Sequence, residues 1–420
     1  MGQYLEAALP VGADPRRHAI ALAQVHEAAL AGATLPNPPR AVIGESWRRM
    51  RGLGLDPDRG TPTDPVAVEV LEERRRRSGL SDALPILRGG LTSVADDAAH
   101  IMVVVDPAGT VLWRDGSSKV RRKADGLGFV EGVSWHENAV GTNAIGTALV
   151  ARRPVQVYSA EHYVRSHHAW TCAAAPLHDP RSGRLLGVVD VSGPAATVHA
   201  STLALVDAVA RLAESQLRNA HLTDLELLRG VAVPALAKVR DRALVIDPHG
   251  WVAAASGLAP VDRIAVPKRC APGRMWLPAF GHCVLEPLPG GWLVRVTGDE
   301  APAATTVTLD LTAPRAPTLT IAGTAGTWSH ALSPRHAEML YVLASHRAGR
   351  SAAELATDLF GDPHPTVTVR AEMSRLRRHF GGILEPRPYR FADGIEVVVL
   401  RPDDPAQVLP HSTAPAVRAR

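Results

Sequence analysis

The chain has 420 residues, of which 46% are hydrophobic but only 4% aromatic, so we expect about two to four domains with cores of alanine, valine and leucine. A formal net charge of +4 is mild and does not by itself require a nucleic-acid partner. Three widely spaced cysteines, Cys172, Cys270 and Cys283, exclude a disulfide framework and a CxxC metal site. No apolar run approaches the length of a membrane span and no signal peptide is visible, so we predict a cytoplasmic protein without a membrane partner.

Residues 1–78 are predicted to be an N-terminal helical segment. An alanine-rich amphipathic helix is expected over 18–30, and a second over 41–51 with Trp47 on its apolar side. The four consecutive arginines at 74–77 follow Glu72 and Glu73. Such a run is typical of a solvated helix face, and a role in nucleic-acid binding is the alternative.

Residues 79–220 have a mixed α/β pattern. The stretch 101–113 predicts two strands joined by a turn, and 184–192 predicts a further strand. A long helix is expected over 201–218, and a helix leaving such a domain often pairs with its twin in a homodimer. Its inward positions are Leu203, Val206, Val209, Ala210, Ala213 and Leu217.

The most distinctive motifs lie between 132 and 193. They include Gly132-Val-Ser-Trp-His-Glu-Asn-Ala-Val-Gly-Thr-Asn-Ala-Ile-Gly146, the segment 170–180 and Gly187-Val-Val-Asp-Val-Ser-Gly193. These residues, together with 39–50, resemble the GAF domain of acetoin-catabolism-type transcriptional regulators over roughly 40–220. The resemblance implies a GAF sensory domain with an antiparallel sheet, flanking helices and a small-molecule effector that the sequence does not identify.

One departure from that family concerns ATP. Many of its members carry a central ATPase domain, which requires a phosphate-binding loop. Gly141 and Gly146 have the right spacing, but Thr147 and Ala148 replace the Lys-Ser/Thr pair that would hold phosphate and magnesium. We therefore expect no ATP hydrolysis and no cofactor.

GAF domains hold ligands between the sheet and the segments that cover it, so the resemblance also implies candidate ligand contacts. Trp135, Asn138, Thr142 and Asn143 are candidates for one wall, and Cys172 and Asp190 for another. The alternative is structural, because Asn and Thr beside glycines often cap turns and Trp135 suits a core.

Histidines near Cys172 raise the question of a metal or haem. His162, His167 and His168 supply imidazoles, but the spacing fits no known zinc pattern and His167-His168 is expected on a surface loop. We predict no metal site here, and Cys172 is expected to be an inert core thiol.

A smaller β-rich module is predicted over 235–300. Its opening, 243–253, echoes 102–112, since both read as strand, Asp-Pro-x-Gly turn and strand. The echo suggests a second, PAS-like module of the same broad kind, although Asp-Pro-x-Gly is also simply a good hairpin turn. Residues 301–328 are predicted to be strand pieces and a linker, and 401–420 a disordered tail.

Residues 329–400 predict a winged helix-turn-helix. Ser333-Pro334 is an N-cap followed by proline, and Ser351 with Glu354 forms a capping box that opens a helix ending at Phe360. A basic helix follows over 366–380, and then a hairpin made of 388–391 and 395–400. The basic helix and the hairpin resemble the last helix and wing of OmpR-type winged helices, which place the helix in the major groove.

The basic helix has an apolar stripe and a basic face. Val369, Met373, Leu376 and Phe380 share the stripe, and residues 366–390 contain six arginines against two acids. A solvated arginine-rich helix is the alternative. We predict groove contacts from Arg370, Arg377 and Arg378, then from Thr368, Ser374 and Arg375, and a wing contact to phosphate from Arg390.

The sequence therefore predicts an α+β multidomain protein with a GAF domain, a PAS-like module and a C-terminal winged helix-turn-helix. The function expected is that of a ligand-responsive one-component transcriptional regulator, a homodimer that binds double-stranded DNA and is not an enzyme. One alternative is a sensory adaptor whose winged helix binds protein. The other is a GAF-fold redox enzyme, which would need a resolving cysteine besides Cys172 in this domain.

Overall fold

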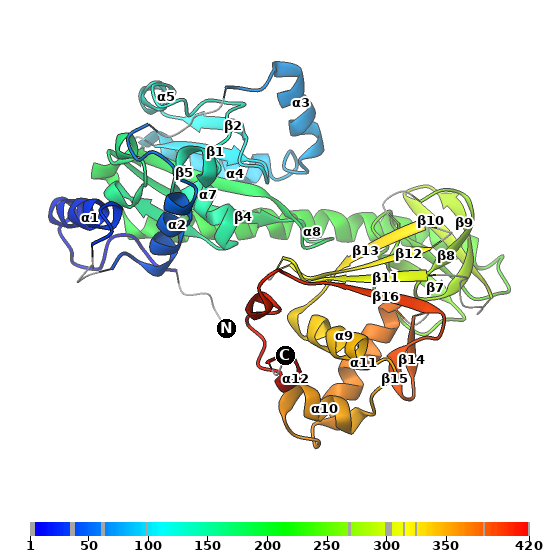
Figure 1. Cartoon of the computed structure of the whole chain (residues 1–420). Helices are drawn as coiled ribbons and strands as arrows, with labels where there is room; N and C mark the ends of the chain where they lie inside the picture. Colours follow the sequence, from blue (N-terminus) through cyan, green and yellow to red (C-terminus); the bar gives the residue numbers. More distant parts are fainter. Residues whose placement is uncertain are drawn as a thin grey trace. The chain divides into compact units, whose positions relative to one another are not determined.

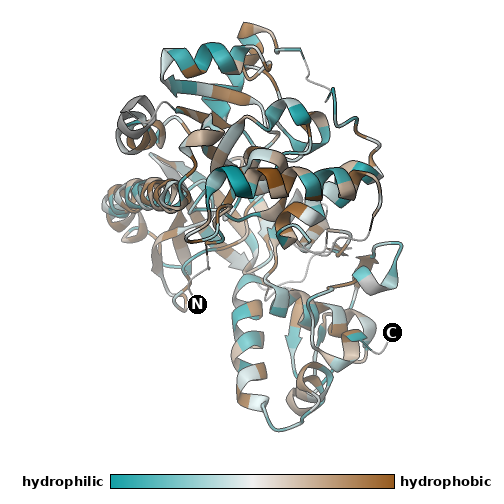
Figure 2. Ribbon diagram, turned by 90° about the vertical axis from the view of Figure 1, so that its left-hand side faces the viewer, coloured by the Kyte–Doolittle hydropathy of each residue, from teal (hydrophilic) through white to brown (hydrophobic). Residues whose placement is uncertain are grey.

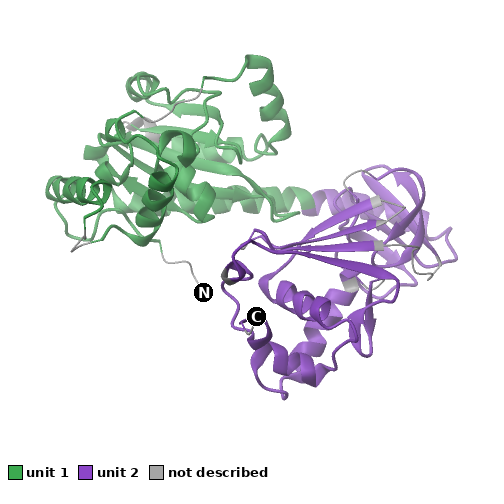
Figure 3. Cartoon of the chain, viewed as in Figure 1, with its two compact units in different colours: residues 1–221 green, residues 222–420 purple. Residues whose placement is uncertain are grey.

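The structure is a computed structural model that describes residues 5–33, 38–59, 64–97, 100–267, 270–298, 305–313, 316–323, 326–380 and 383–418. The chain divides into two compact units, residues 1–221 and 222–420 (Figure 3). Their boundary falls within one helix, α8 (Ala200–Leu236). The fold is mixed α+β, with several antiparallel sheets and flanking helices (Figure 1).

The first unit is built around a five-stranded antiparallel sheet. Its strands are β1 (Ile101–Val105), β2 (Val111–Gly116), β3 (Val155–Tyr158), β4 (Trp170–His178) and β5 (Leu185–Pro194), in the order β2-β1-β5-β4-β3. All five residues of β1 are buried, because helices cover both faces of the sheet. This explains why β1 has an unbroken apolar sequence instead of an alternating one.

Each face of this sheet has its own core. Met102 and Val104 of β1 pack with α4 (Leu84–Asp97) and with the first half of α8. Ile101, Val103 and Val105 pack on the opposite side with α2 (Ala41–Gly52), α5 (Ser118–Asp125), α6 (Glu137–Val140) and α7 (Ala144–Ala151). The candidate ligand residues belong to this second side.

The N-terminal helices are part of the first unit and not a separate segment that ends at residue 78. Ile43, Trp47 and Met50 of α2 are buried in the same core as β1, and α1 (Pro15–Leu30) contacts the segment after β3. The sequence alone did not show this, since an amphipathic helix does not reveal which surface its apolar side will cover.

The four-arginine run lies at the end of α3 (Val68–Arg77) and is largely structural. Arg74 donates to Asp106 at 2.6 Å, and Arg75 donates to the Leu112 carbonyl and to Glu131, both at 2.8 Å. Arg76 and Arg77 are exposed and pair with Glu73. The run therefore ties α3 to β1–β2 at one end and forms a solvated face at the other.

A second five-stranded sheet repeats the first. Its strands are β6 (Ala243–Ile246), β7 (Val252–Ser256), β8 (Gly273–Leu277), β9 (Gly281–Leu288) and β10 (Gly291–Gly298), in the order β7-β6-β10-β9-β8. This is the same antiparallel order as in the first sheet, with each strand in the corresponding place. Leu225, Leu228 and Ala232 of α8 pack on one face of it.

The two Asp-Pro-x-Gly turns have the same hydrogen bonds. Asp106 accepts from the backbone N–H groups of residues 108 and 110, and Asp247 accepts from those of residues 249 and 251, at 2.8–2.9 Å. Each turn is followed by an isolated bridge, from Thr110 to Ser134 and from Trp251 to Arg263. The echo between 102–112 and 243–253 thus corresponds to a repeated sheet and not only to a similar turn.

Residues 305–331 contain three strands, so the strand pieces expected over 301–328 are confirmed in its described part, while the expected linker is wrong there. The strands are β11 (Thr305–Asp310), β12 (Thr318–Gly323) and β13 (Gly326–Ala331), and the sheet order is β13-β12-β11-β16, with β16 (Ile395–Leu400) parallel to β11. Val307, Leu309, Leu319 and Ile321 are buried. Their strict alternation with threonine and alanine is the strand signal that the Ala/Thr/Pro-rich composition obscured.

Three helices and a hairpin follow this sheet. They are α9 (Pro334–Ser345), α10 (Ala352–Phe360), α11 (Thr366–Phe380) and the pair β14 (Leu384–Pro386) and β15 (Tyr389–Phe391). Ser333 caps α9, the Ser351–Glu354 capping box is formed, and Gly361 ends α10 in the left-handed region. The expected pairing of 388–391 with 395–400 is wrong, because β15 pairs with β14 while β16 joins β11.

The described residues after 400 are not a disordered tail. A short 3-10 turn (Pro405–Gln407) and α12 (Pro415–Arg418) lie on this unit, and Val408, Leu409, Ala414 and Val417 are buried in its core. The helices of the chain carry hydrophilic and hydrophobic residues side by side along their ribbons (Figure 2). Among the described helices, we find none that is both long and apolar enough to span a bilayer.

Candidate functional site

Asp190 is a fully buried carboxylate of the first unit. It lies on β5 with 0% exposure, on the sheet face that α2, α6 and α7 cover. The Ser192 hydroxyl donates to its Oδ2 at 2.5 Å, whereas Oδ1 has no partner among the described residues. Burial raises the pKa of Asp190 to about 7, although the Ser192 hydrogen bond opposes the shift. An unpaired buried acceptor of this kind is costly unless something binds it.

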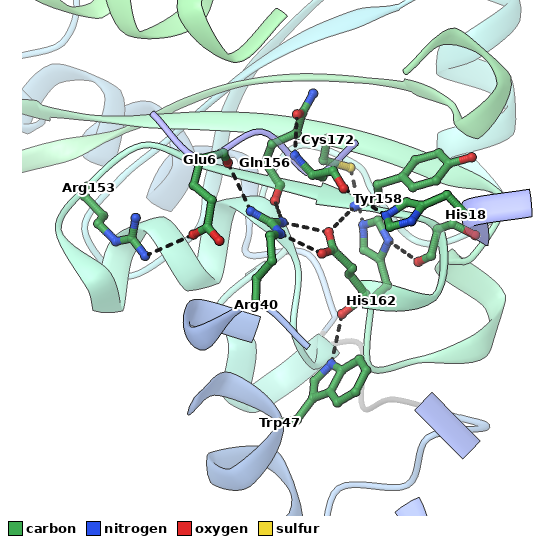
Figure 4. Close-up of polar contacts among 12 residues, drawn as sticks. Glu6, His18, Arg40, Trp47, Arg153, Gln156, Tyr158, His162 and Cys172 are labelled. Atoms are coloured by element: carbon green, nitrogen blue, oxygen red, sulfur yellow. Dashed lines mark hydrogen bonds and ion pairs between the residues drawn. The ribbon is translucent and has the colours of Figure 1, made fainter. Parts of the chain in front are cut away.

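Cys172 and His162 lie beside Asp190. Cys172 is on β4, opposite Ser192, and its Sγ is 3.5 Å from His162 Nε2 (Figure 4). Burial lowers the pKa of His162 to about 3, and burial together with the Asp190 charge raises the pKa of the Cys172 thiol well above its usual range. Both groups are therefore neutral at pH 7, and the thiol is poorly suited to nucleophilic or redox chemistry.

Trp135 and His167 extend this polar cluster. Their ring centroids are 5.2 Å apart, and Trp135 also contacts Phe129 at 4.1 Å. Trp135 Nε1 and His167 Nδ1 are buried without hydrogen-bond partners among the described residues. Burial lowers the pKa of His167 to about 4. We call Trp135, His162, His167, Cys172, Asp190 and Ser192 the polar cluster.

The N-terminal helices hold the backbone segment that carries the two histidines. Arg40, just before α2, donates to both oxygens of Glu161 at 2.7 and 2.8 Å, and also to the carbonyls of Gln156 and Glu6 (Figure 4). Trp47 Nε1 donates to the Glu161 carbonyl at 2.9 Å. A ligand that displaced the 159–168 segment would therefore also displace α2, through the hydrogen bonds of Arg40 and Trp47 to Glu161.

The predicted ligand residues divide into two groups. Trp135, Cys172 and Asp190 belong to the polar cluster, whereas Asn143 caps α7 by accepting from the Gly146 N–H at 2.9 Å. The Thr142 hydroxyl is 2.7 Å from that of Ser46, and Asn138 is exposed beside His136. Asn143 thus has the capping role that the alternative interpretation of the sequence named, whereas Thr142 and Asn138 contact the side chains of Ser46 and His136.

Ser192 was missed as a member of this cluster, whereas His162 and His167 were grouped with Cys172 but weighed as metal ligands and not as ligand contacts. His167 is buried, so the expectation of a surface loop at His167-His168 is wrong for that residue. Ser192 could have been found, because it alternates with Asp190 along β5 and so shares its face. The described part of the chain holds no group of three or more His, Cys, Asp or Glu side chains arranged for a metal ion.

The second candidate site is the outer face of α11. Val369, Met373, Leu376 and Phe380 are buried as the apolar stripe, while Thr368, Arg370, Ser374 and Arg375 are exposed. Arg370 has no hydrogen-bond or ion-pair partner among the residues that the structure describes. Val367, which was not among the predicted DNA contacts, is 76% exposed on this helix.

The other predicted DNA contacts differ in their environment. Arg377 is partly buried and its Nε donates to the Leu384 carbonyl at 3.3 Å, at the base of the hairpin. Arg390 pairs with Glu385 at 2.8 Å and with Asp393 at 2.9 Å, and Arg375 pairs with Glu372. The side chain of Arg378 lies outside the described residues.

Comparison with known proteins shows that the first unit is similar to the N-terminal part of transcriptional regulators. Residues 22–219 match the family described as "MimR, N-terminal domain". The acetoin dehydrogenase operon transcriptional activator AcoR of Bacillus subtilis is 38% identical over 42% of this chain and 29% of its own length. The propane 2-monooxygenase operon transcriptional activator MimR of Mycolicibacterium goodii is 33% identical over 39% of this chain and 27% of its own length.

One relative is similar along most of the chain. It is a 47.3 kDa uncharacterized protein in the thcA 5' region of Rhodococcus erythropolis, 32% identical over 86% of this chain and 64% of that protein. The chain thus spans less than a third of AcoR and MimR and just under two thirds of this relative. Among solved structures, a chain of the E. coli DhaR(N)-DhaL complex is similar at 19% identity, covering 61% of this chain and 99% of that chain with a TM-score of 0.40. Through residues 22–219, the chain is therefore related to the N-terminal domain of the acetoin- and propane-operon transcriptional activators.

Proposed function

We propose that this protein is a ligand-responsive transcriptional regulator without ATPase activity, in which the first unit senses a small molecule and α9–α11 bind double-stranded DNA. The observation that carries the proposal is α11. Its basic outer face is exposed opposite a buried stripe, in a chain whose N-terminal half is related to transcriptional activators. The first unit is then a GAF domain, the repeated sheet a PAS-like module, and residues 305–400 a winged helix-turn-helix domain.

DNA recognition would centre on Arg370 and Ser374. An exposed guanidinium on a helix that enters the major groove can contact guanine or phosphate, and the exposed methyl groups of Val367 suit a thymine methyl. Arg390 contributes less in this proposal, because two carboxylates already neutralise it. Arg377 acts mainly by holding the hairpin against α11.

Sensing would use the polar cluster. The cluster offers a ligand three buried polar atoms. Asp190 Oδ1 can accept a hydrogen bond, Trp135 Nε1 can donate one, and His167 Nδ1 can do either. A small neutral molecule with hydroxyl or carbonyl groups would satisfy them without burying a net charge.

The signal would leave along α8. Leu203 and Val206 pack on the first sheet and Leu228 and Ala232 on the second, so one helix is anchored in both cores. Leu212, Leu222, Leu227 and Val233 of α8 are exposed, and we propose that they contribute to a homodimer.

The test is fluorescence anisotropy of the purified protein with DNA from upstream of its own gene, across a salt series. We expect affinity to fall steeply with salt, because bound arginines displace counterions from phosphate. Arg370→Ala should weaken binding roughly tenfold or more and reduce the salt slope by about one.

Arg274→Ala is the matched control, since Arg274 is an exposed arginine on β8 of the same unit. Equal affinity of all three proteins, unchanged on unrelated DNA, would contradict the proposal. It would favour the alternative of a sensory adaptor whose winged helix binds protein.

A further inference from the structure

Helix α5 of the first unit presents a basic surface that neither the polar cluster nor the outer face of α11 explains. The helix directly follows β2, an edge strand of the first sheet (Figure 1). Its side chains Val120 and Ala124 are buried in the core of the unit. The exposed side chains of the helix include four cations, which are Lys119, Arg121, Arg122 and Lys123.

These four cations are not compensated by carboxylates. None of them has a hydrogen-bond or ion-pair partner among the residues that the structure describes. The acids nearest to them in the sequence are already engaged, since Asp115 pairs with Arg88 at 3.0 Å and Asp125 pairs with Arg114 at 2.8 Å. Residues 118–124 therefore carry an excess of four positive charges.

Several other exposed arginines of this unit do have carboxylate partners. Arg76 and Arg77 both contact Glu73, and Arg211 contacts Asp207 at 2.9 Å. Those surfaces mix acids with bases, as a solvated helix face commonly does. The surface of α5 differs from them, because its cations stand together without acids between them.

The arrangement is also unfavourable for the helix itself. Lys119 lies in the first turn, where the backbone N–H groups already give the end of the helix a partial positive charge. Lys119 is three and four positions before Arg122 and Lys123, so like charges are neighbours on one face. Breaking a local rule without a compensating contact is expected at functional sites. A polyanion along this face would relieve the repulsion.

We propose that α5 is a second nucleic-acid contact, through which the first unit binds the phosphate backbone of duplex DNA independently of base sequence. Lysine, arginine and serine side chains commonly contact DNA phosphates, and Ser118 is exposed beside the cations. None of the exposed large hydrophobic side chains of the described residues belongs to α5. The helix thus lacks the apolar anchors that protein interfaces and membrane surfaces use. The choice of DNA rests on the proposed function, which brings a duplex to this protein.

The experiment is fluorescence anisotropy of the full chain with two labelled duplexes across a sodium chloride series. One duplex comes from upstream of the protein's own gene and the other has an unrelated sequence. In Arg122→Gln/Lys123→Gln, we expect the slope of log affinity against log salt to fall by about two, because each lost phosphate contact releases about one counterion fewer. Affinity at physiological salt should fall roughly tenfold or more, by the same factor for both duplexes.

Arg76→Gln/Arg77→Gln is the matched control. It removes the same net charge from exposed arginines of the same unit, but these arginines already have a carboxylate partner. This control should bind both duplexes like the wild type. Lys119→Gln/Arg121→Gln is a second variant of α5 that should reproduce the loss, so the result does not depend on the folding of a single variant.

Two outcomes would overturn the proposal. One is an equal salt slope in the wild type, the control and both α5 variants. The other is a loss of affinity in the α5 variants for the upstream duplex alone, because phosphate contacts are common to all sequences.

Arg370→Ala, measured alongside, separates this inference from the proposed function. Weaker binding in Arg370→Ala with no change in the α5 variants overturns the role of α5 and leaves the proposed function standing. Weaker binding in the α5 variants alone supports the role of α5 and contradicts DNA binding through α11.

A fluorescent polyglutamate probe tests for an acidic protein as the partner instead. If the α5 variants bind polyglutamate more weakly than the wild type but bind both duplexes equally well, the DNA proposal is overturned. The basic surface of α5 would then be assigned to an acidic protein surface.

Discussion

The polar cluster contains two kinds of buried ionisable group, and pH affects their contributions to stability in opposite directions. Burial lowers the pKa of His167 to about 4 and raises that of Asp190 to about 7. The unfolded chain would protonate His167 near pH 6.5 and Asp190 near pH 3.8. As pH falls from 7 to 5, His167 therefore binds a proton in the unfolded chain but not in the folded protein. This difference destabilises the fold. Over the same range, Asp190 binds a proton in the folded protein but not in the unfolded chain. This difference stabilises the fold.

Single substitutions should separate these two effects. When pH falls from 7 to 5, the free energy of unfolding should decrease by about 2 kcal/mol less in His167→Gln than in the wild type. The variant lacks the histidine whose protonation in the unfolded chain destabilises the fold. Asp190→Asn should show a difference of opposite sign and of the same order, on the order of 2 kcal/mol. Urea unfolding of the three proteins at both pH values measures each difference.

His178→Gln is a useful control, because His178 is partly exposed beside Glu214 on the opposite side of the first unit's sheet. Parallel pH profiles for the wild type, His167→Gln and Asp190→Asn would show that the two groups titrate alike in the folded and unfolded states. The proposed buried polar cluster would then be incorrect.

The sequence distinguished these residues only in part. Asp190 and Cys172 were selected because they sit in motifs that resemble a known domain, and their shared face follows from strand alternation. Asn143 and Asp190 are both polar residues in glycine-containing motifs. They differ because Asp190 has one oxygen, Oδ1, buried without a partner among the described residues, and that burial depends on segments far apart in the chain.

At the scale of the element, the duplicated sheet is enforced by two glycines in corresponding places. A Cβ at Gly187 of β5 would lie 1.9 Å from the carbonyl oxygen of Val105, and one at Gly291 of β10 would lie 2.1 Å from that of Ile246. Val105 and Ile246 end the first strand of their sheets. In both sheets, the last strand can therefore pass this close to the carbonyl oxygen at the end of the first strand only because a side chain is absent there.

Gly187→Ala and Gly291→Ala should each destabilise the protein by roughly 1–3 kcal/mol or more, because a backbone oxygen has to move. Gly89→Ala in α4 and Gly230→Ala in α8 are the controls. Neither position has an atom within 4 Å of the added Cβ, so we expect a neutral effect or a gain of up to about 1 kcal/mol.

Chemical unfolding, followed by tryptophan fluorescence, measures all four variants. If the two strand variants were as stable as the two helix variants, the close approach between first and last strands would not exist in solution.

Element types were predictable where the signal is local. The apolar stripe and the caps of α9 to α11 come from residues three or four positions apart, and the structure has these helices close to the expected bounds. The pairing of β16 was not predictable in this way. Its partner β11 lies about ninety residues earlier, and nothing local distinguishes that pairing from a hairpin with β15.

At the scale of the whole molecule, the chain after residue 400 closes the core of the second unit. Leu409 and Val417 are 6% exposed, and Ala414 is fully buried beside α9 and α10. An apolar surface of this unit is therefore covered by the end of the chain.

Deleting residues 405–420 should loosen α9 and α10 and leave the first unit unchanged. We expect faster amide hydrogen exchange in 334–360 and no change in 101–194, because the two regions belong to different compact units. Hydrogen exchange with mass spectrometry resolves the two regions in the full chain. Unchanged exchange in 334–360 would mean that the tail does not pack there, and a matched deletion of 5–9 at the other end should spare 334–360.

The sequence by itself determined the helices of the C-terminal domain, the strands around the two Asp-Pro-x-Gly turns and the relationship of residues 22–219 to a family of regulators. These features depend on periodicity, capping and motifs that a continuous stretch of chain contains. Only the tertiary structure decided that the N-terminal helices belong to the first unit, that residues 305–331 and the tail complete the second unit, and which polar side chains are buried unpaired. Those outcomes depend on contacts between residues distant in sequence, whose free energy is gained only when the chain has closed around them.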